Sequence, residues 1–151
     1  MTDPSDPVPP AALLRGAGLR VTSARSAIIE ALRGEQHQSA EQVAARVRER
    51  VGSVSTQAVY EALGALTEAG LLRRIEPMGR AARYETRVGD NHHHLVCRSC
   101  GAVADVDCAV GHAPCLEPVH AAGFAVDEAD VVYWGTCPAC QESAREPITS
   151  A

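Results

Sequence analysis

The sequence predicts an α+β protein of two parts, a helical N-terminal domain that ends in a β-hairpin and a small α/β domain behind it. Three observations support this fold class. Apolar residues recur at helical spacing up to residue 70, and two short strand patterns follow at 71–76 and 81–87. Beyond residue 91 the apolar pattern alternates, and four of the six cysteines form two Cys-x-x-Cys pairs.

Four helices are expected in the N-terminal part. The first covers residues 11–17 and stops at a glycine. The next three follow side chains that cap a helix N-terminus well, namely Thr22, Ser39 and Ser55. Gln42 lies three residues after Ser39 and completes a capping box. Glycines at positions 34, 52 and 70 end these helices.

A β-hairpin with its turn at residues 77–80 is expected after the fourth helix, and helix, turn, helix and hairpin is the order of a winged helix. Any three-helix segment buries its apolar faces in this way, and the helix-turn-helix has uses other than DNA binding. Arginines favour DNA: residues 10–33 contain four against one glutamate, and residues 71–87 contain five against two. The expected partner is therefore double-stranded DNA.

The formal net charge of -5 hides a difference between the halves of the chain. Residues 1–90 contain 12 arginines and 11 acidic residues, whereas residues 91–151 contain two and eight. The N-terminus carries acids and prolines without an apolar run, which excludes a secretory signal, and no stretch is long enough to span a bilayer. We expect a cytoplasmic protein with no membrane partner, in which cysteines stay reduced and hold metal.

The strongest motif is the pair Cys97-x-x-Cys100 and Cys137-x-x-Cys140, which suits a tetrahedral structural zinc site. The 36 residues between the pairs should fold as strand, short helix and strand. The alternative is a dithiol redox motif at Cys137-Pro-Ala-Cys140, but a second pair favours metal. No His-x-Glu deaminase motif or Gly-x-Ser-x-Gly nucleophile motif is present, so we expect neither an enzyme nor a small organic substrate.

A second cluster of metal-binding residues begins at His92-His93-His94, just before the first cysteine pair. Strand alternation places His92 and His94 on one face and His93 on the other. If the strand turns back through residues 97–101, His94 lies opposite Asp105, and two imidazoles with a carboxylate suit Fe(II), Mn(II) or Zn(II). The alternative is that these histidines are solvated surface residues. The other histidines have weaker patterns: His112 and His120 fit surface positions, and His37 precedes a helix cap.

These patterns divide the chain into five segments. Each domain is small and aromatic residues are few, so the core depends on Ala, Val and Leu. Metal and a second copy of the chain should supply the missing stability, which predicts a homodimer. The expected segments are a disordered leader (1–10), a winged-helix DNA-binding domain (11–87), a linker (88–91), a zinc-containing dimerisation domain (92–141) and a disordered tail (142–151).

From Ala12 to Gln141 the sequence resembles the ferric uptake regulator family. The matching motifs are Gly18-Leu-Arg-Val-Thr22 with Arg25, His37-Gln-Ser-Ala-Glu41, Ala58-Val-Tyr60, Arg83-Tyr-Glu85, His92-His-His-Leu-Val-Cys-Arg-Ser-Cys-Gly101 and His120-Ala-Ala-Gly-Phe124. The resemblance implies a homodimeric, metal-dependent repressor of palindromic operator DNA, with structural Zn²⁺ on the four paired cysteines and regulatory Fe²⁺ or Mn²⁺. The regulatory ligands would be His37, Glu85, His92, His94 and Asp105. DNA contacts are expected from Arg20, Ser55, Gln57, Tyr60, Arg73 and Arg83.

Departures from the family pattern bear on DNA binding and sensing. Glu61 stands where the family commonly has an arginine, so the wing arginines should carry more of the DNA contact. Glu85 is typical of iron-sensing members, whereas the short spacer and the segments 89–94 and 104–111 resemble actinobacterial repressors of catalase-peroxidase genes. We favour the peroxide-defence interpretation; an iron-responsive regulator and a thiol redox protein remain alternatives. Cys108 and Cys115 fit plain structural positions, with a redox pair as the alternative. His93 and His120 are candidates for a third metal site.

Overall fold

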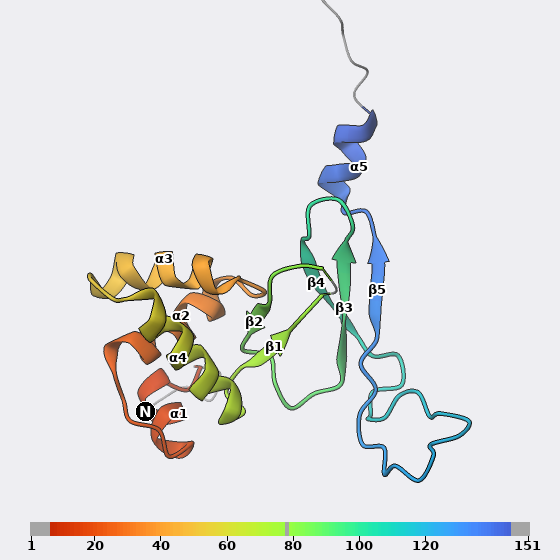
Figure 1. Cartoon of the computed structure of the whole chain (residues 1–151), viewed down its shortest axis with the longest axis horizontal. Helices are drawn as coiled ribbons and strands as arrows, with labels where there is room; N and C mark the ends of the chain where they lie inside the picture. The colour runs from red at the N-terminus through yellow and green to blue at the C-terminus, as the bar shows by residue number, and fades with distance from the viewer. Residues whose placement is uncertain (1–6, 78, 146–151) are drawn as a thin grey trace, which may run out of the picture. The chain divides into compact units, whose positions relative to one another are not determined.

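The computed structural model describes residues 7–77 and 79–145 (Figure 1), and the chain divides between Val88 and Gly89 into two compact units. The first unit contains four helices followed by a two-stranded antiparallel sheet. Its elements are α1 (Pro10–Gly16), α2 (Ser23–Gly34), α3 (Ala40–Val51), α4 (Thr56–Glu68), β1 (Arg73–Ile75) and β2 (Arg83–Glu85). This is the winged-helix order that the sequence predicts.

The three predicted helix N-caps are confirmed. The side chains of Thr22, Ser39 and Ser55 each accept a hydrogen bond from the backbone N–H three residues later. At Ser39 the Gln42 side chain also accepts from the Ser39 backbone N–H at 2.8 Å, which completes the capping box. The two strands are shorter than the expected ranges 71–76 and 81–87.

The substitution Ser39→Ala should lower the free energy of unfolding of the first unit by about 1 kcal/mol, because the Gln42 N–H in the first turn of α3 loses its side-chain acceptor. Urea unfolding followed by the helical circular dichroism signal measures the change. Ser53→Ala is the matched control, since Ser53 is exposed in the loop before α4, and should change stability by less than about 0.5 kcal/mol. Equal unfolding midpoints for the two variants would contradict the capping role.

The core of the first unit is aliphatic, and Tyr84 of β2 packs into it. The Tyr84 backbone N–H also donates to the Gln38 carbonyl at 3.0 Å, so the wing is joined to the segment just before α3. Burial of these side chains supplies the hydrophobic stabilisation of the unit. Its fully buried members come from all four helices and include Leu14, Ile28, Leu32, Val43, Val47, Val59, Leu63 and Leu66.

The second unit is a three-stranded sheet in the order β4-β3-β5, followed by one helix. β4 runs antiparallel and β5 parallel to the central strand. The predicted pairing of His94 with Asp105 is confirmed, and the Cys97 N–H donates to the Ala102 carbonyl at 2.8 Å where the chain turns back. The elements are β3 (His92–Cys97), β4 (Val103–Asp107), β5 (Val132–Gly135) and α5 (Pro138–Arg145).

The connection between β4 and β5 differs from the expectation. Residues 108–131, all of which are described, form turns and extended chain instead of the predicted short helix. Pro114 and Pro118, with Gly111 and Gly123, explain this, because proline lacks the N–H that a helix needs and glycine disfavours a helix interior.

The chain ends also bear on the predicted segments. α5 continues to Arg145, beyond residue 141, where the sequence placed the end of the ordered domain. Residues 1–6 and 146–151 of the predicted leader and tail lie outside the described residues. In the part of the chain that the structure describes, no helix is both long and apolar enough to cross a membrane.

Candidate metal centres

The second unit gathers the four paired cysteines into one cluster. Cys97 ends β3 and Cys100 lies in the following turn, while Cys137 follows β5 and Cys140 lies in α5. Because β5 runs parallel to β3 with Gly135 opposite Cys97, both Cys-x-x-Cys turns meet at the same end of the sheet. The four sulfur atoms all lie within 4.8 Å of one another.

The geometry of this cluster fits a tetrahedral zinc ion. Zinc–sulfur bonds of about 2.3 Å in a tetrahedron place two sulfurs about 3.8 Å apart, and the Cys100 and Cys137 Sγ atoms are 3.6 Å apart. Four sulfurs that converge in this way favour a metal site over the dithiol redox motif.

Electrostatics in the cluster also prepare it for a cation. Backbone N–H groups of Cys100 and Cys137 point at the Cys97 sulfur and lower the pKa of that thiol to about 5, with Cys137 N lying 3.3 Å from Cys97 Sγ. The neighbouring sulfurs of Cys137 and Cys100 raise the pKa of Cys140 to about 12. The thiolate form of Cys97 is therefore favoured, whereas the neighbouring sulfurs oppose ionisation of Cys140. A divalent cation between the four sulfurs would allow all of them to ionise together.

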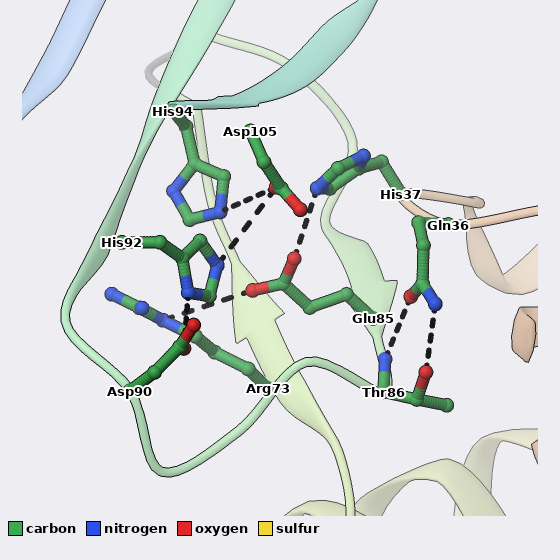
Figure 2. A network of polar contacts seen from close by, with 9 residues as sticks. All are labelled: Gln36, His37, Arg73, Glu85, Thr86, Asp90, His92, His94 and Asp105. Carbon is green, nitrogen blue, oxygen red and sulfur yellow. Dashed lines mark hydrogen bonds and ion pairs between the residues drawn. The ribbon is translucent and has the colours of Figure 1, made fainter. Parts of the chain in front are cut away.

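The opposite end of β3 carries nitrogen and oxygen ligands. The Nε2 atoms of His92 and His94 lie 3.8 Å and 3.7 Å from Asp105 Oδ1, and the two imidazole rings meet edge to face (Figure 2). Asp90 Oδ1 lies 2.6 Å from His92 Nδ1. That hydrogen bond orients the ring and leaves Nε2 directed at the carboxylate, the outer-shell arrangement that metal-bound histidines use.

The first unit carries a separate histidine–carboxylate pair. His37 Nε2 lies 2.9 Å from Glu85 Oε2, and Glu85 is completely buried (Figure 2). Arg73 Nε lies 4.0 Å from the other Glu85 oxygen. Two bridges hold the pair: the backbone bond between Gln38 and Tyr84, and the Gln36 amide, which accepts from Thr86 N–H at 2.8 Å and donates to its hydroxyl at 2.7 Å. Neither Gln36 nor Asp90 was singled out from the sequence, because an orienting residue has no spacing signature of its own.

The other predicted site residues fall elsewhere. His93 points to the far face of the sheet and contacts Cys115, at 3.1 Å from Nε2 to Sγ. Cys108 belongs to the same cluster, whereas exposed His120 does not. His112 is exposed in the loop between β4 and β5.

Among the DNA candidates, Arg20, Ser55, Gln57 and Tyr60 are exposed. Two of them have polar partners on the same unit: the Tyr60 hydroxyl donates to Glu41 at 2.6 Å, and the Gln57 amide donates to Glu61 at 3.1 Å. The two wing candidates, Arg73 and Arg83, are less exposed. Arg83 donates to the Gln42 side chain at 2.8 Å, and Arg73 lies beside Glu85.

A winged helix with a histidine–glutamate pair, followed by a unit with a thiolate cluster and a histidine–aspartate set, defines a metal-binding winged-helix protein. The model of the ferric uptake regulator family matches residues 16–133, and the chain belongs to this family.

Individual relatives agree with this assignment. The chain is 58% identical over 130 residues to the transcriptional regulator FurA of Mycobacterium tuberculosis, covering 86% of this chain and 88% of that one. It is 56% identical over 124 residues to ferric uptake regulation protein 1 of Mycolicibacterium fortuitum, covering 82% and 77%. A solved ferric uptake regulator from Pseudomonas aeruginosa with manganese is 28% identical, covers 87% of this chain and 99% of its own, and has a TM-score of 0.66.

Family membership settles the broad class. The protein is a metal-responsive transcriptional regulator and not an enzyme, as the sequence predicted. The Pseudomonas aeruginosa structure was solved with manganese, and this chain contains both cysteine-rich and histidine–carboxylate groups that could hold a metal ion.

Proposed function

We propose that the chain is a cytoplasmic, homodimeric repressor that binds palindromic operator DNA when its regulatory metal is present. In this proposal it controls peroxide-defence genes, including catalase-peroxidase, and leaves DNA when the metal is lost or the protein is oxidised. The observation that carries the proposal is that each unit holds part of a metal-ligand set. The first unit offers His37 and Glu85, and the second offers His92, His94 and Asp105. The two ligands of the first unit and the three of the second are each fewer than the four to six that divalent metal ions usually take, whereas the five residues together reach that number.

The connection between the units suits a shared ion. Glu85 ends β2 and His92 begins β3, so only residues 86–91 separate a ligand of one set from a ligand of the other. Seven residue steps span at most about 25 Å when fully extended. The short connection therefore limits how far apart the two ligand sets can lie, and it is compatible with one ion taking ligands from both.

A shared ion would act on DNA binding through geometry. Ligands from both units would fix the angle between them in each subunit of the dimer. That angle sets the distance between the two recognition helices, which must match major grooves about 34 Å apart per helical turn. We call the arrangement in which one ion takes ligands from both units the closed arrangement. Metal can shift the equilibrium between the open and closed arrangements only as far as it binds the closed one more tightly than the open one.

α4 is the proposed recognition helix, because Gln57 and Tyr60 are exposed on it and Ser55 caps its N-terminus. Tyr60 must exchange its hydrogen bond with Glu41 for one to DNA. Glu61 adds a negative charge beside it, which places more of the phosphate attraction on Arg20, Arg73 and Arg83.

The homodimer is supported by apolar side chains that the second unit leaves exposed. Leu95 of β3 and Tyr133 of β5 are paired in register and are 45% and 48% exposed, and Phe124 in the preceding loop is 79% exposed. Contiguous exposed apolar residues mark protein interaction surfaces. We propose that a second copy of the chain covers them.

Release of the repressor from DNA in response to peroxide would require iron in the regulatory site. Fe(II) held by imidazoles would catalyse the transfer of one oxygen atom from peroxide to the ring of His37 or His92, with the second oxygen leaving as water, and the oxidised ring would bind metal less well. Glu85 favours the alternative, an iron-responsive regulator that loses its metal by simple dissociation. A thiol redox protein acting through Cys108 and Cys115 is the third reading, since these two sulfurs lie in one cluster.

DNA binding measured with each of Fe(II), Mn(II) and Zn(II), before and after dilute peroxide, separates these functions. We expect protection of a palindromic duplex that needs Fe(II) or Mn(II), loss of binding by the Fe(II) form after peroxide, and a gain of one oxygen on His37 or His92 by mass spectrometry. An Fe(II) form that resists peroxide but releases DNA when iron is chelated would establish the iron-responsive alternative. A peroxide-induced Cys108–Cys115 disulfide that releases DNA in the Mn(II) form would favour the thiol route. Duplex binding that ignores metal would overturn the shared-ion proposal.

A further inference from the structure

The face of β3 opposite His92 and His94 carries a further cluster of atoms that could bind a metal ion. His93 is only 4% exposed, and its Nε2 lies 3.1 Å from Cys115 Sγ. The Cys108 sulfur joins them, and the three ligand atoms all lie within 4.8 Å of one another. The other ring nitrogen of His93 is buried, with no hydrogen-bond partner among the described residues.

The loop after β4 brings the two cysteines to this face. Cys108 directly follows β4, and the chain reverses at Gly111, whose φ of 78° lies in the left-handed region that glycine tolerates. The Asn91 side chain donates to the His112 carbonyl at 2.7 Å and ties the loop to the residue before β3. Backbone N–H groups of Gly111 and Val110 lower the pKa of the Cys108 thiol, which favours the thiolate that binds metal.

We propose that His93, Cys108 and Cys115 hold a second zinc ion, distinct from the ion of the four-cysteine cluster and from the regulatory metal. In a tetrahedral site with one imidazole, zinc would place nitrogen and sulfur about 3.6 Å apart. His93 Nε2 and Cys115 Sγ, at 3.1 Å, need only a small opening to admit it. Three protein ligands leave the fourth position to water.

The ligand types separate this ion from the regulatory one. Two thiolates and an imidazole form a soft set that selects zinc, whereas the imidazoles and carboxylates on the other face suit Fe(II) or Mn(II). His93 stands between His92 and His94 on one strand, so the two sites would lie on opposite faces of β3. Zinc would also attach residues 108–115 to β3. That attachment would restrict the motion of β3 on the face opposite His92 and His94. The proposal stands whether or not the regulatory site works as described above.

The test counts zinc in full-length protein purified with reductant, in a His92→Ala background so that the regulatory site does not retain zinc. After dialysis against a weak chelator we expect Cys115→Ser and Cys108→Ser to hold one zinc ion fewer per chain than the background protein. His120→Ala and His112→Ala are matched controls, because both histidines are exposed, lie in the same connection and are not members of the cluster. They should retain the full zinc content.

Cadmium titration gives an independent reading, because cadmium–thiolate absorption reports sulfur ligands alone. The background protein should show a further rise after the four-cysteine cluster is filled, and the Cys115→Ser protein should not. Zinc should also slow alkylation of Cys108 and Cys115, which keeps the proposal testable if either serine variant folds poorly. Three results would each overturn the proposal of a zinc site at His93, Cys108 and Cys115. They are equal zinc content in the background protein and the serine variants, an alkylation rate that zinc does not change, and a Cys108–Cys115 disulfide in the reductant-treated protein.

Discussion

Cys137→Ser should prevent zinc from binding at the four-cysteine cluster and unfold the second unit while the first unit stays folded. The reason is the small core of the second unit. Among the residues that the structure describes, its buried apolar side chains are Val96 and Cys97, and the remainder belong to the first unit. Such a core cannot offset the conformational entropy of ordering three short strands and a helix. Zinc binding at thiolates contributes about 10–16 kcal/mol in zinc-finger peptides at neutral pH, which is ample for this purpose.

Hydrogen exchange of the full-length chain measures this prediction unit by unit. We expect amides of β3, β4 and β5 to lose protection in the Cys137→Ser protein, and amides of α2, α3 and α4 to keep it. The variant should also sediment as a monomer, because the exposed apolar residues of β3 and β5 would no longer form one surface. Ala139→Ser, an exposed position inside the same Cys-x-x-Cys turn, is the matched control and should keep its zinc and its protection. Full protection of β3 to β5 without zinc would refute the structural role of the cluster.

The features that sequence predicted well depend on short-range chemistry. The helix starts at Ser39 and Ser55 could be predicted because each serine side chain accepts a hydrogen bond from the backbone N–H only three residues later. The pairing of His94 with Asp105 follows from the tight turn after Cys97, because a turn fixes the register of the strands it joins.

The features that sequence did not reveal depend on long-range packing. His37 and Glu85 are 48 residues apart, and they meet because Gln38 bonds to Tyr84 and Gln36 bonds to Thr86. No periodicity connects such positions, and only the family resemblance indicated them. The contact of His93 with Cys115 was missed for the same reason, since it depends on the irregular path of a loop in which a helix was expected.

The substitution His92→Ala should abolish metal-dependent DNA binding and leave the four-cysteine zinc and the sheet intact. His92 supplies one of the five ligands in the proposed shared site, and its Nε2 is aimed at Asp105. Loss of that imidazole removes affinity for the closed arrangement, and DNA affinity in Mn(II) should fall to that of the metal-free protein. Fluorescence anisotropy with an operator duplex at fixed salt measures this, and salt must be fixed because phosphate contacts make the affinity salt-dependent.

A graded variant distinguishes the role of His92 as a ligand from a merely structural one. Asp90→Asn keeps every ligand but replaces the carboxylate that lies 2.6 Å from His92 Nδ1. Loss of such an outer-shell partner typically costs 10–100-fold in metal affinity. Its DNA binding should therefore recover when Mn(II) is raised by about that factor, whereas His92→Ala should not recover, and His112→Ala should bind as the unaltered chain does. If His92→Ala and the unaltered chain respond to Mn(II) alike, with zinc and exchange protection equal, the ion does not bind where we place it, and the two units are not coupled through His92.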